Sequence, residues 1–124
     1  MNEERKKSVL VVDDESTNIL VLTYILSSDY TVRAAINGKS AIETAEKYLP
    51  DVILLDIVMP DMDGFEVITA LKNSEKTKNI PVIFITGLDS AGHEEKGLSM
   101  GAADYIKKPA EKSELLERVA RIVK

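Results

Sequence analysis

The sequence predicts an α/β domain in which a mostly parallel sheet of five strands carries helices on both faces. Three observations support this prediction. Short apolar runs, typical of buried strands, alternate five times with segments of helical periodicity along the 124 residues. A chain of this length supports one hydrophobic core, so we expect a single domain over residues 1–124. Polar residues follow four of the five runs, at the edge where parallel sheets bind ligands.

The expected strands are short and aliphatic. Three of them are continuous apolar runs, as expected for strands that are covered on both faces. The second strand is a weaker candidate, and the fifth is short. The predicted strands are Ser8–Val12, Tyr30–Ala35, Val52–Leu55, Pro81–Ile85 and Ala103–Ile106.

The expected helices lie between these strands and show apolar residues at helical spacing. The fourth contains Gly92 and Gly97, which weaken a helix by about 1 kcal/mol each relative to alanine. Ser113 is the expected N-cap of the last helix, and Asn37-Gly38 is a turn signal before the second. The predicted helices are Ser16–Leu26, Ser40–Leu49, Phe65–Leu71, Ser90–Met100 and Ser113–Val123.

Five polar residues mark the carboxyl ends of the strands. Asp13 and Asp14 follow the first strand, Asp56 the third, Thr86 the fourth and Lys108 the fifth. Two doubly wound strand orders are common. The order 2-1-3-4-5 makes the first, third and fourth strands adjacent and gathers all five residues around one pocket. The order 3-2-1-4-5 separates Asp56 from Asp13 by a strand, so we favour the first.

Composition narrows the classes of function. The net charge of -5 and the lack of a basic stripe argue against direct nucleic-acid binding. The absence of cysteine removes disulfides and thiolate metal sites and fits a cytoplasmic location. No apolar run approaches the roughly 20 residues that a membrane span needs, so we expect no membrane association.

Three carboxylates at one sheet edge require compensation. Two such charges 4 Å apart repel by about 4 kcal/mol at an effective dielectric constant of 20. A raised pKa or a bound cation relieves this repulsion. A set of oxygen ligands without histidine or cysteine favours Mg²⁺, which prefers one or two carboxylates together with a phosphate. Lys108 and the Thr86 hydroxyl would then face the phosphoryl oxygens.

These motifs together resemble the receiver domain of bacterial two-component response regulators. The resemblance rests on Asp13-Asp14, the run D-I-V-M-P-D-M-D-G from Asp56, Thr86-Gly87 and Lys108-Pro109, and it extends from Ser8 to the C-terminus. It implies a flavodoxin-like (βα)5 fold with strand order 2-1-3-4-5, in agreement with the order favoured above.

The resemblance implies that Asp56 accepts a phosphoryl group from a histidine kinase or a phosphotransfer protein. It also implies that Asp14, the Asp56 carboxylate and the backbone carbonyl of Val58 bind Mg²⁺ directly, with Asp13 acting largely through water. The expected activity is limited to self-phosphorylation from phosphodonors and autodephosphorylation.

The resemblance also implies a switch. Lys108 would contact a phosphoryl oxygen, and the Thr86 hydroxyl and the Gly87 backbone N–H would bind another. Tyr105 would turn inward as Thr86 moves, and this would change the face formed by the fourth helix, the fifth strand and the last helix. That face would address an output domain or a target protein, or form a homodimer. The Lys108–Pro109 peptide bond is expected to be cis.

Four further expectations concern side chains beside the motifs. Val58 and Leu88 are apolar where the family often has polar residues, so we expect a long-lived acyl phosphate. His93 is expected to be solvated on the fourth helix, and Lys107 to face solvent. The methionines at positions 59, 62 and 100 are expected to serve in packing.

Other functions are compatible with parts of the pattern. A Mg²⁺-dependent phosphohydrolase could use Asp56 as its nucleophile, but Val58 stands where such enzymes usually carry a general acid. A flavodoxin-like cofactor site would need a phosphate-binding loop in place of Asp13-Asp14-Glu15. An unphosphorylated docking module would not need the complete acidic set.

Overall fold

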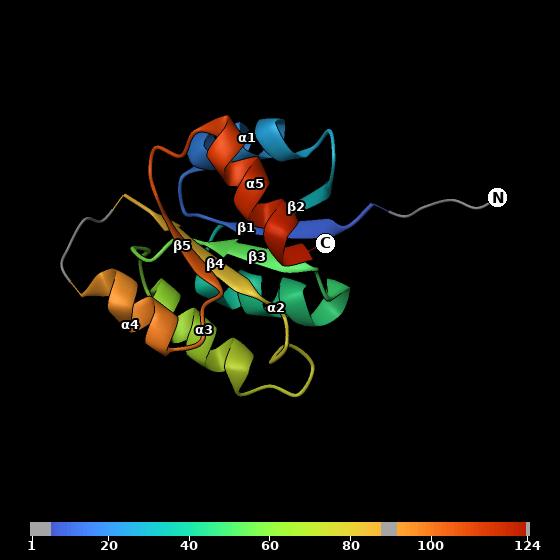
Figure 1. Cartoon of the computed structure of the whole chain (residues 1–124). Coiled ribbons are helices and arrows are strands. Elements are labelled where there is room, and N and C mark those ends of the chain that lie inside the picture. Colours follow the sequence, from blue (N-terminus) through green and yellow to red (C-terminus); the bar gives the residue numbers. More distant parts are fainter. Residues whose placement is uncertain (1–5, 88–91, 124) are drawn as a thin grey trace.

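A sheet of five parallel strands lies at the centre of the computed structural model, which describes residues 6–87 and 92–123 (Figure 1). The strand order is β2-β1-β3-β4-β5, which confirms the predicted order. Each strand lies within one residue of its predicted position. The strands are β1 (Ser8–Val12), β2 (Thr31–Ala35), β3 (Val52–Leu55), β4 (Val82–Thr86) and β5 (Asp104–Lys107).

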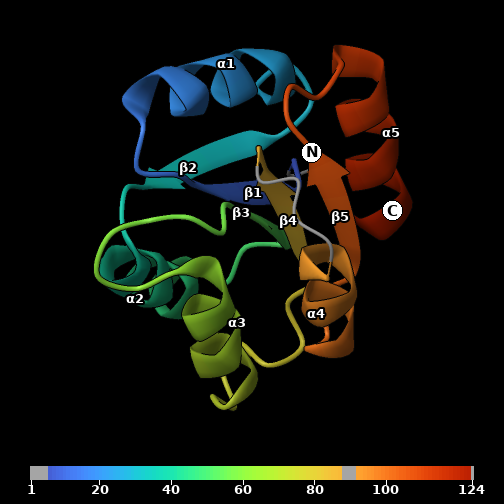
Figure 2. The ribbon, with the colours of Figure 1, turned by 90° about the vertical axis from the view of Figure 1, so that its left-hand side faces the viewer.

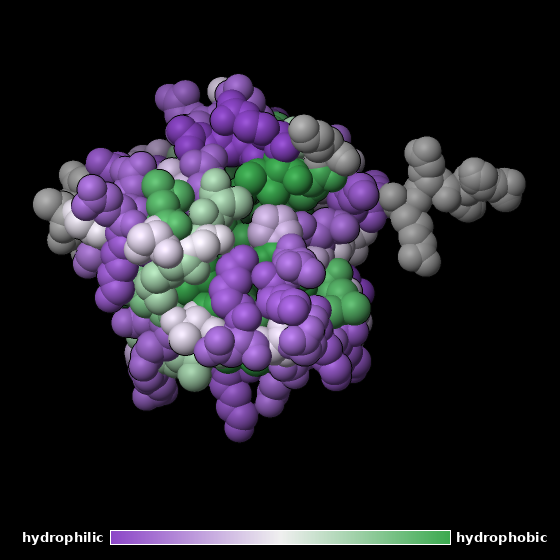
Figure 3. Space-filling view, turned by 60° about the horizontal axis from the view of Figure 1, so that its bottom comes forward, coloured by the Kyte–Doolittle hydropathy of each residue, from purple (hydrophilic) through white to green (hydrophobic). Residues whose placement is uncertain are grey.

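Helices cover both faces of the sheet. The helices are α1 (Ser16–Leu26), α2 (Gly38–Tyr48), α3 (Gly64–Lys72), α4 (His93–Ser99) and α5 (Lys112–Val123). Figure 2 shows α1 and α5 on one face and α2, α3 and α4 on the other. The side of α2, α3 and α4 is largely hydrophilic, with small apolar areas between the polar side chains (Figure 3). Within the described ranges, no helix is long and apolar enough to cross a membrane.

The buried strands fill two separate cores. Successive side chains of a strand point to opposite faces of the sheet, so each strand contributes to both cores. Leu10 and Ile53 pack against α2 and α3, whereas Val11 and Leu54 pack against α1 and α5. All four residues of β3 are buried, as a continuous apolar run predicts.

The loop between β3 and α3 is fixed by a capping box. The Asp63 carboxylate accepts the Glu66 N–H at 2.9 Å, and the Glu66 carboxylate accepts the Asp63 N–H at 2.9 Å. The Gly64 N–H donates to the carbonyl oxygen of Ile57 at 2.8 Å. A Cβ at Gly64 would collide with the backbone carbonyl of Asp56 and lie 2.9 Å from the Ile57 Cα. Glycine is therefore needed for the loop to fold back against the end of β3.

The second helix differs from its prediction at both ends. It begins at Gly38 rather than Ser40, because the Asn37 side chain accepts the Ser40 N–H at 2.8 Å and caps the helix. It ends at Tyr48, and Leu49 adopts the left-handed conformation with φ 48°. A non-glycine residue in this conformation is uncommon and costs about 1–2 kcal/mol.

The last two helices also differ from expectation. The described part of α4 begins at His93 rather than Ser90, and residues 88–91 lie outside the described residues. A Cβ at Gly97 would lie 2.8 Å from the Phe84 ring, so this glycine lets α4 approach β4 closely. The last helix begins at Lys112, so Ser113 lies in its first turn and the predicted N-cap is wrong.

The expectation of a solvated His93 is wrong. The imidazole is half-buried and meets the Phe65 ring edge-on, with centroids 5.7 Å apart. Its Nδ1 atom is buried without a hydrogen-bond partner among the described residues. The helical pattern gave no sign of this contact, which arises because α4 packs beside α3. The packing role of the methionines is confirmed: Met59 is buried, and Met62 and Met100 pack against the same core.

Candidate functional site

The predicted polar residues gather at the carboxyl edge of the sheet. They surround an open cavity of about 430 Å³. The predicted residues that line it are Asp14, Asp56, Val58, Thr86, Gly87 and Lys108. Asp13 lies beneath them and is only 1% exposed. The strand order therefore brings together residues that are up to 95 positions apart in the sequence, as Lys108 and Asp13 are.

Two of the carboxylates are held in place by the backbone. The Asp56 N–H donates to the carbonyl oxygen of Val12 at 3.0 Å, which extends the pairing of β1 and β3 by one residue. One oxygen of Asp56 accepts the Ile57 N–H at 2.8 Å. One oxygen of Asp13 accepts the Glu15 N–H at 3.0 Å. Both side chains are thus oriented before any ligand binds.

Lys108 bridges the two buried carboxylates. Its Nζ lies 2.7 Å from Asp13 Oδ2 and 3.5 Å from Asp56 Oδ2. Burial alone would lower the pKa of Lys108, but its hydrogen bond to Asp13 and the negative charges of Asp56 and Asp13 outweigh burial and raise the pKa. The backbone N–H of Lys108 donates to the Thr86 carbonyl at 2.9 Å. The Lys108–Pro109 peptide bond is cis, as expected.

The positive charge of Lys108 does not balance the negative charge of the carboxylates in the site. Burial and, less strongly, the negative charge of Asp13 raise the pKa of Asp56 above its ordinary value. The charge of Lys108 and hydrogen bonds from the Thr86 side chain and the Ile57 backbone oppose this increase without cancelling it. The edge of the sheet therefore retains an excess of negative charge that a further cation would relieve.

The donors fit a hard divalent cation. Asp13, Asp14 and Asp56 each offer one carboxylate oxygen, and these three atoms lie within 4.8 Å of one another. Asp14 is exposed and borders the cavity, so solvent or a phosphate can complete the coordination. Carboxylate and carbonyl oxygens are the ligands that Mg²⁺ prefers. The Val58 side chain is 58% exposed on the rim of the same cavity.

The two expected switch residues point inward. Thr86 is 1% exposed, and its hydroxyl contacts the Asp56 carboxylate. Tyr105, in β5, is 6% exposed and belongs to the core on the α3 side. Lys107 is exposed, as expected from strand alternation. Leu88, the second apolar residue expected at the rim, lies outside the described residues.

Two polar residues on the rim were not predicted as site residues. Glu15 and Asn18 line the cavity, and Asn18 Nδ2 donates to Glu15 Oε1 at 3.1 Å. Glu15 directly follows Asp14, and Asn18 lies in the first turn of α1. The sequence could have indicated both residues, because Glu15 follows the two aspartates and Asn18 lies in the first turn of the next helix. A helix that starts at a strand end keeps its first turn beside that end.

Comparison with known proteins identifies the class of this fold and site. Residues 9–120 match the family of response regulator receiver domains, and the chain belongs to this family. The chain is 42% identical over 117 residues to the response regulator PleD of Caulobacter vibrioides, covering 94% of this chain and 26% of PleD. It is 41% identical over 119 residues to a probable cyclic di-GMP phosphodiesterase of Vibrio cholerae, covering 96% of this chain and 27% of that protein. The chain thus spans about a quarter of the length of these relatives.

Solved structures agree with this assignment. The receiver domain of the sensor histidine kinase PA1611 from Pseudomonas aeruginosa superposes with a TM-score of 0.87 and 29% identity, over 95% of this chain and 98% of that one. That structure has a magnesium ion coordinated in its active-site cleft. The chain is therefore a receiver domain of two-component phosphorylation signalling, as the sequence motifs implied.

Proposed function

We propose that the chain acts as a single receiver domain that accepts a phosphoryl group on Asp56 from a histidine kinase or a phosphotransfer protein. One observation carries the choice of Asp56. Both oxygens of Asp13 already accept hydrogen bonds, from Glu15 and Lys108, and this side chain is buried below the cavity. Asp56 borders the cavity and lies 3.5 Å from the Lys108 ammonium. It thus combines access for a phosphodonor with a nearby positive charge.

The residues around Asp56 suit phosphoryl transfer. An Asp56 oxygen forms a bond to phosphorus while the bond from phosphorus to the donor nitrogen breaks, and the electron pair leaves with the imidazole. This reaction needs positioning and charge neutralisation more than covalent assistance. The Lys108 ammonium, the Thr86 hydroxyl and the Gly87 backbone N–H would contact the phosphoryl oxygens. Asp14, Asp56 and the Val58 backbone carbonyl would hold Mg²⁺ directly, with Asp13 acting largely through water, and the ion would supply positive charge to the phosphoryl oxygens.

The rim of the cavity favours a signalling role over a phosphohydrolase. A hydrolase that used Asp56 as nucleophile would need a proton donor for the leaving group. Val58, two residues later, has no proton to donate, and its exposed aliphatic side chain would hinder an attacking water. We therefore expect slow autodephosphorylation and a long-lived acyl phosphate. The alternative of an unphosphorylated docking domain leaves the buried Asp13–Lys108–Asp56 cluster without a role.

Phosphorylation would act by shifting a two-state equilibrium. A phosphoryl group bound to Thr86 would favour the inward positions that Thr86 and Tyr105 occupy in this structure over outward ones. The face formed by α4, β5 and α5 would then present a changed surface to an output domain or target protein, or to a second copy. We place the domain in the cytoplasm, without direct binding to nucleic acid or membrane.

Incubation with Mg²⁺ and acetyl phosphate tests the assignment of Asp56. Intact-protein mass spectrometry should show a single phosphoryl adduct of about 80 Da. The adduct should be absent in Asp56→Ala and in the presence of EDTA. An adduct that persists in Asp56→Ala would move the phosphoacceptor elsewhere. No adduct from acetyl phosphate or from a phosphorylated histidine donor would favour the docking module, and steady phosphate release from unrelated esters would favour a hydrolase.

A further inference from the structure

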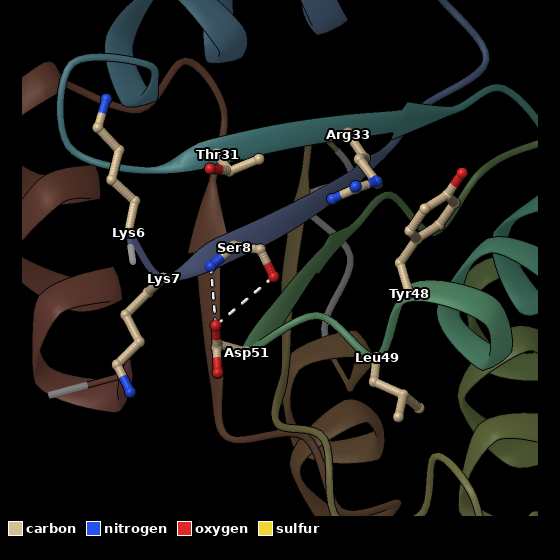
Figure 4. A pocket seen from close by; sticks show the side chains of 8 residues that line it. All are labelled: Lys6, Lys7, Ser8, Thr31, Arg33, Tyr48, Leu49 and Asp51. Carbon is tan, nitrogen blue, oxygen red and sulfur yellow. Dashed lines mark hydrogen bonds between the residues drawn. The ribbon is translucent and has the colours of Figure 1, made fainter. Parts of the chain in front are cut away.

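A second cavity lies at the opposite edge of the sheet, where the first three strands begin (Figure 4). Its volume is about 490 Å³, and Ser8, Thr31 and Asp51 form its floor. This volume lies within the range of about 300–1,000 Å³ that is usual for small-molecule sites. Phosphoryl transfer at Asp56 uses none of these residues, because they stand at the other ends of the strands.

One rim of this cavity is a preformed contact between a guanidinium group and an aromatic ring. The guanidinium carbon of Arg33 lies 3.8 Å from the centroid of the Tyr48 ring. Figure 4 shows this pair beside Leu49 at one end of the cavity. Arg33 has no carboxylate partner among the described residues, and it is only half-buried. A guanidinium that rests on an aromatic ring on one side can stack on a nucleobase with its other side.

The other end of the cavity carries two exposed ammonium groups. Lys6 and Lys7 flank the start of β1, on the far side of the floor from Arg33 (Figure 4). Neither forms an ion pair within the described ranges, and the Lys6 ammonium makes only a 3.4 Å contact with the Ser27 carbonyl. Three cations thus line one cavity of a chain whose net charge is -5. Long flexible ammonium side chains are common phosphate ligands.

The floor contributes an acceptor. Asp51 Oδ2 accepts the Ser8 N–H at 2.8 Å, which fixes the carboxylate in the middle of the cavity. A carboxylate here disfavours a compact polyanion and favours a ligand that also carries hydrogen-bond donors. A nucleotide has this distribution: a flat base, hydroxyl donors on the ribose and a terminal phosphate.

We propose that this cavity binds a purine nucleotide. The base stacks on the guanidinium of Arg33, which Tyr48 supports from behind. The ribose hydroxyls face the Asp51 carboxylate. The phosphate is bound by the long, flexible side chains of Lys6 and Lys7, whose ammonium groups lie on opposite sides of the start of β1 in Figure 4 and would turn toward it. This binding is independent of the proposed phosphorylation of Asp56 and would stand if that proposal failed.

Isothermal titration calorimetry with GMP, AMP, ribose 5-phosphate and hexaglutamate tests the proposal. Both nucleotides should saturate one site below about 1 mM, and ribose 5-phosphate should bind more weakly. Loss of a base stack weakens binding by about 5- to 150-fold, so Arg33→Gln and Tyr48→Ala should both fall in this range. The matched controls Arg121→Gln and Tyr24→Ala remove the same residue types from exposed helix positions and should bind normally. The variant Asp56→Asn should also bind normally.

Several outcomes would overturn the proposal. Absence of saturable binding of either nucleotide to the folded wild-type protein would exclude the site. Equal affinity for ribose 5-phosphate and GMP would exclude the stacking of a base. Tighter binding of hexaglutamate than of GMP would assign the cavity to an acidic peptide. Circular dichroism of each variant shows whether lost binding reflects lost folding, and Arg33→Lys, which keeps the charge without the flat group, provides a second test.

Discussion

Replacing Asp56 with asparagine is expected to stabilise the fold in the absence of divalent cations. The substitution keeps the shape of the side chain and the acceptor for the Ile57 N–H, and it removes one charge from the cluster. Burial and the charge of Asp13 already raise the pKa of Asp56, so the folded state disfavours its charged form. Removing that charge relieves the folded state more than the hydrated unfolded chain.

The magnitude follows from the distances. The Asp13 and Asp56 oxygens lie within 4.8 Å of each other, which corresponds to a repulsion of at least about 3.5 kcal/mol at an effective dielectric constant of 20. Losing the attraction to Lys108, 3.5 Å away, costs about 4.7 kcal/mol on the same scale. The substitution also relieves the burial penalty of a carboxylate, several kcal/mol, and a solvent-screened repulsion from exposed Asp14, so the favourable contributions exceed the lost attraction. We expect the free energy of unfolding to rise by about 1–3 kcal/mol, with about 4 °C in Tm per kcal/mol.

The gain should depend on pH. Because the folded-state pKa of Asp56 is raised above its ordinary value of 3.8, the stability that it contributes is complete below that value. This stability is lost as the pH rises through the folded-state pKa. Asparagine does not titrate, so the advantage of the variant should be largest at neutral pH and shrink as the pH falls toward 4.

Urea unfolding followed by circular dichroism, in EDTA at pH 5 and pH 7.5, measures this difference. Asp61→Asn is the matched control, because Asp61 is an exposed carboxylate in the loop that follows, with φ 71°, a conformation that asparagine also tolerates. Mg²⁺ should stabilise the wild type more than Asp56→Asn. The electrostatic reasoning would be refuted by an Asp56→Asn variant no more stable than Asp61→Asn in EDTA at pH 7.5.

Four further substitutions test other parts of the site and the loop beside it. Lys108→Met should destabilise the metal-free fold by about 2–4 kcal/mol, because it leaves two buried carboxylates unpaired; an unchanged urea midpoint in EDTA would contradict this. Val58→Asn should speed loss of the phosphoryl group from Asp56 by about tenfold, the effect of lowering the barrier by about 1.4 kcal/mol. An unchanged decay rate in a phosphate-release assay would show that the Val58 side chain does not protect the acyl phosphate from water. Gly64→Ala should cost about 1–3 kcal/mol through its collision with the backbone, whereas Gly87→Ala, whose Cβ would meet nothing within 4 Å, should be nearly neutral by thermal unfolding.

Much of the site could be predicted because parallel strands end at one edge. The positions of Asp13, Asp56, Thr86 and Lys108 followed from apolar runs that each stop at a polar residue, and the strand order then brought them together. The prediction needed no side-chain geometry, since a strand fixes where its last residue lies. The same rule could not rank the carboxylates, because the hydrogen bonds that occupy both oxygens of Asp13 come from the Glu15 N–H before α1 and from the Lys108 ammonium after β5.

The parts that were missed depend on contacts between helices. The fourth helix was expected to start at Ser90 with a solvated His93, because only its weak helical pattern was visible. Its position depends on Gly97, which lets it approach the Phe84 ring, and on the contact of His93 with Phe65. Such contacts join segments whose sequences carry no shared period, so residue patterns along the chain do not reveal them.

The separation of the two cores by the sheet has an evolutionary consequence. Leu26 and Val119 pack in one core, and Ala45 and Ile68 pack in the other. Substitutions without shared neighbours have nearly additive effects on stability. Epistasis between the two sides should therefore be weak. The residues on the α1–α5 side could be substituted during evolution independently of those on the α2–α3–α4 side. Substitutions in one core can thus accumulate without compensating substitutions in the other.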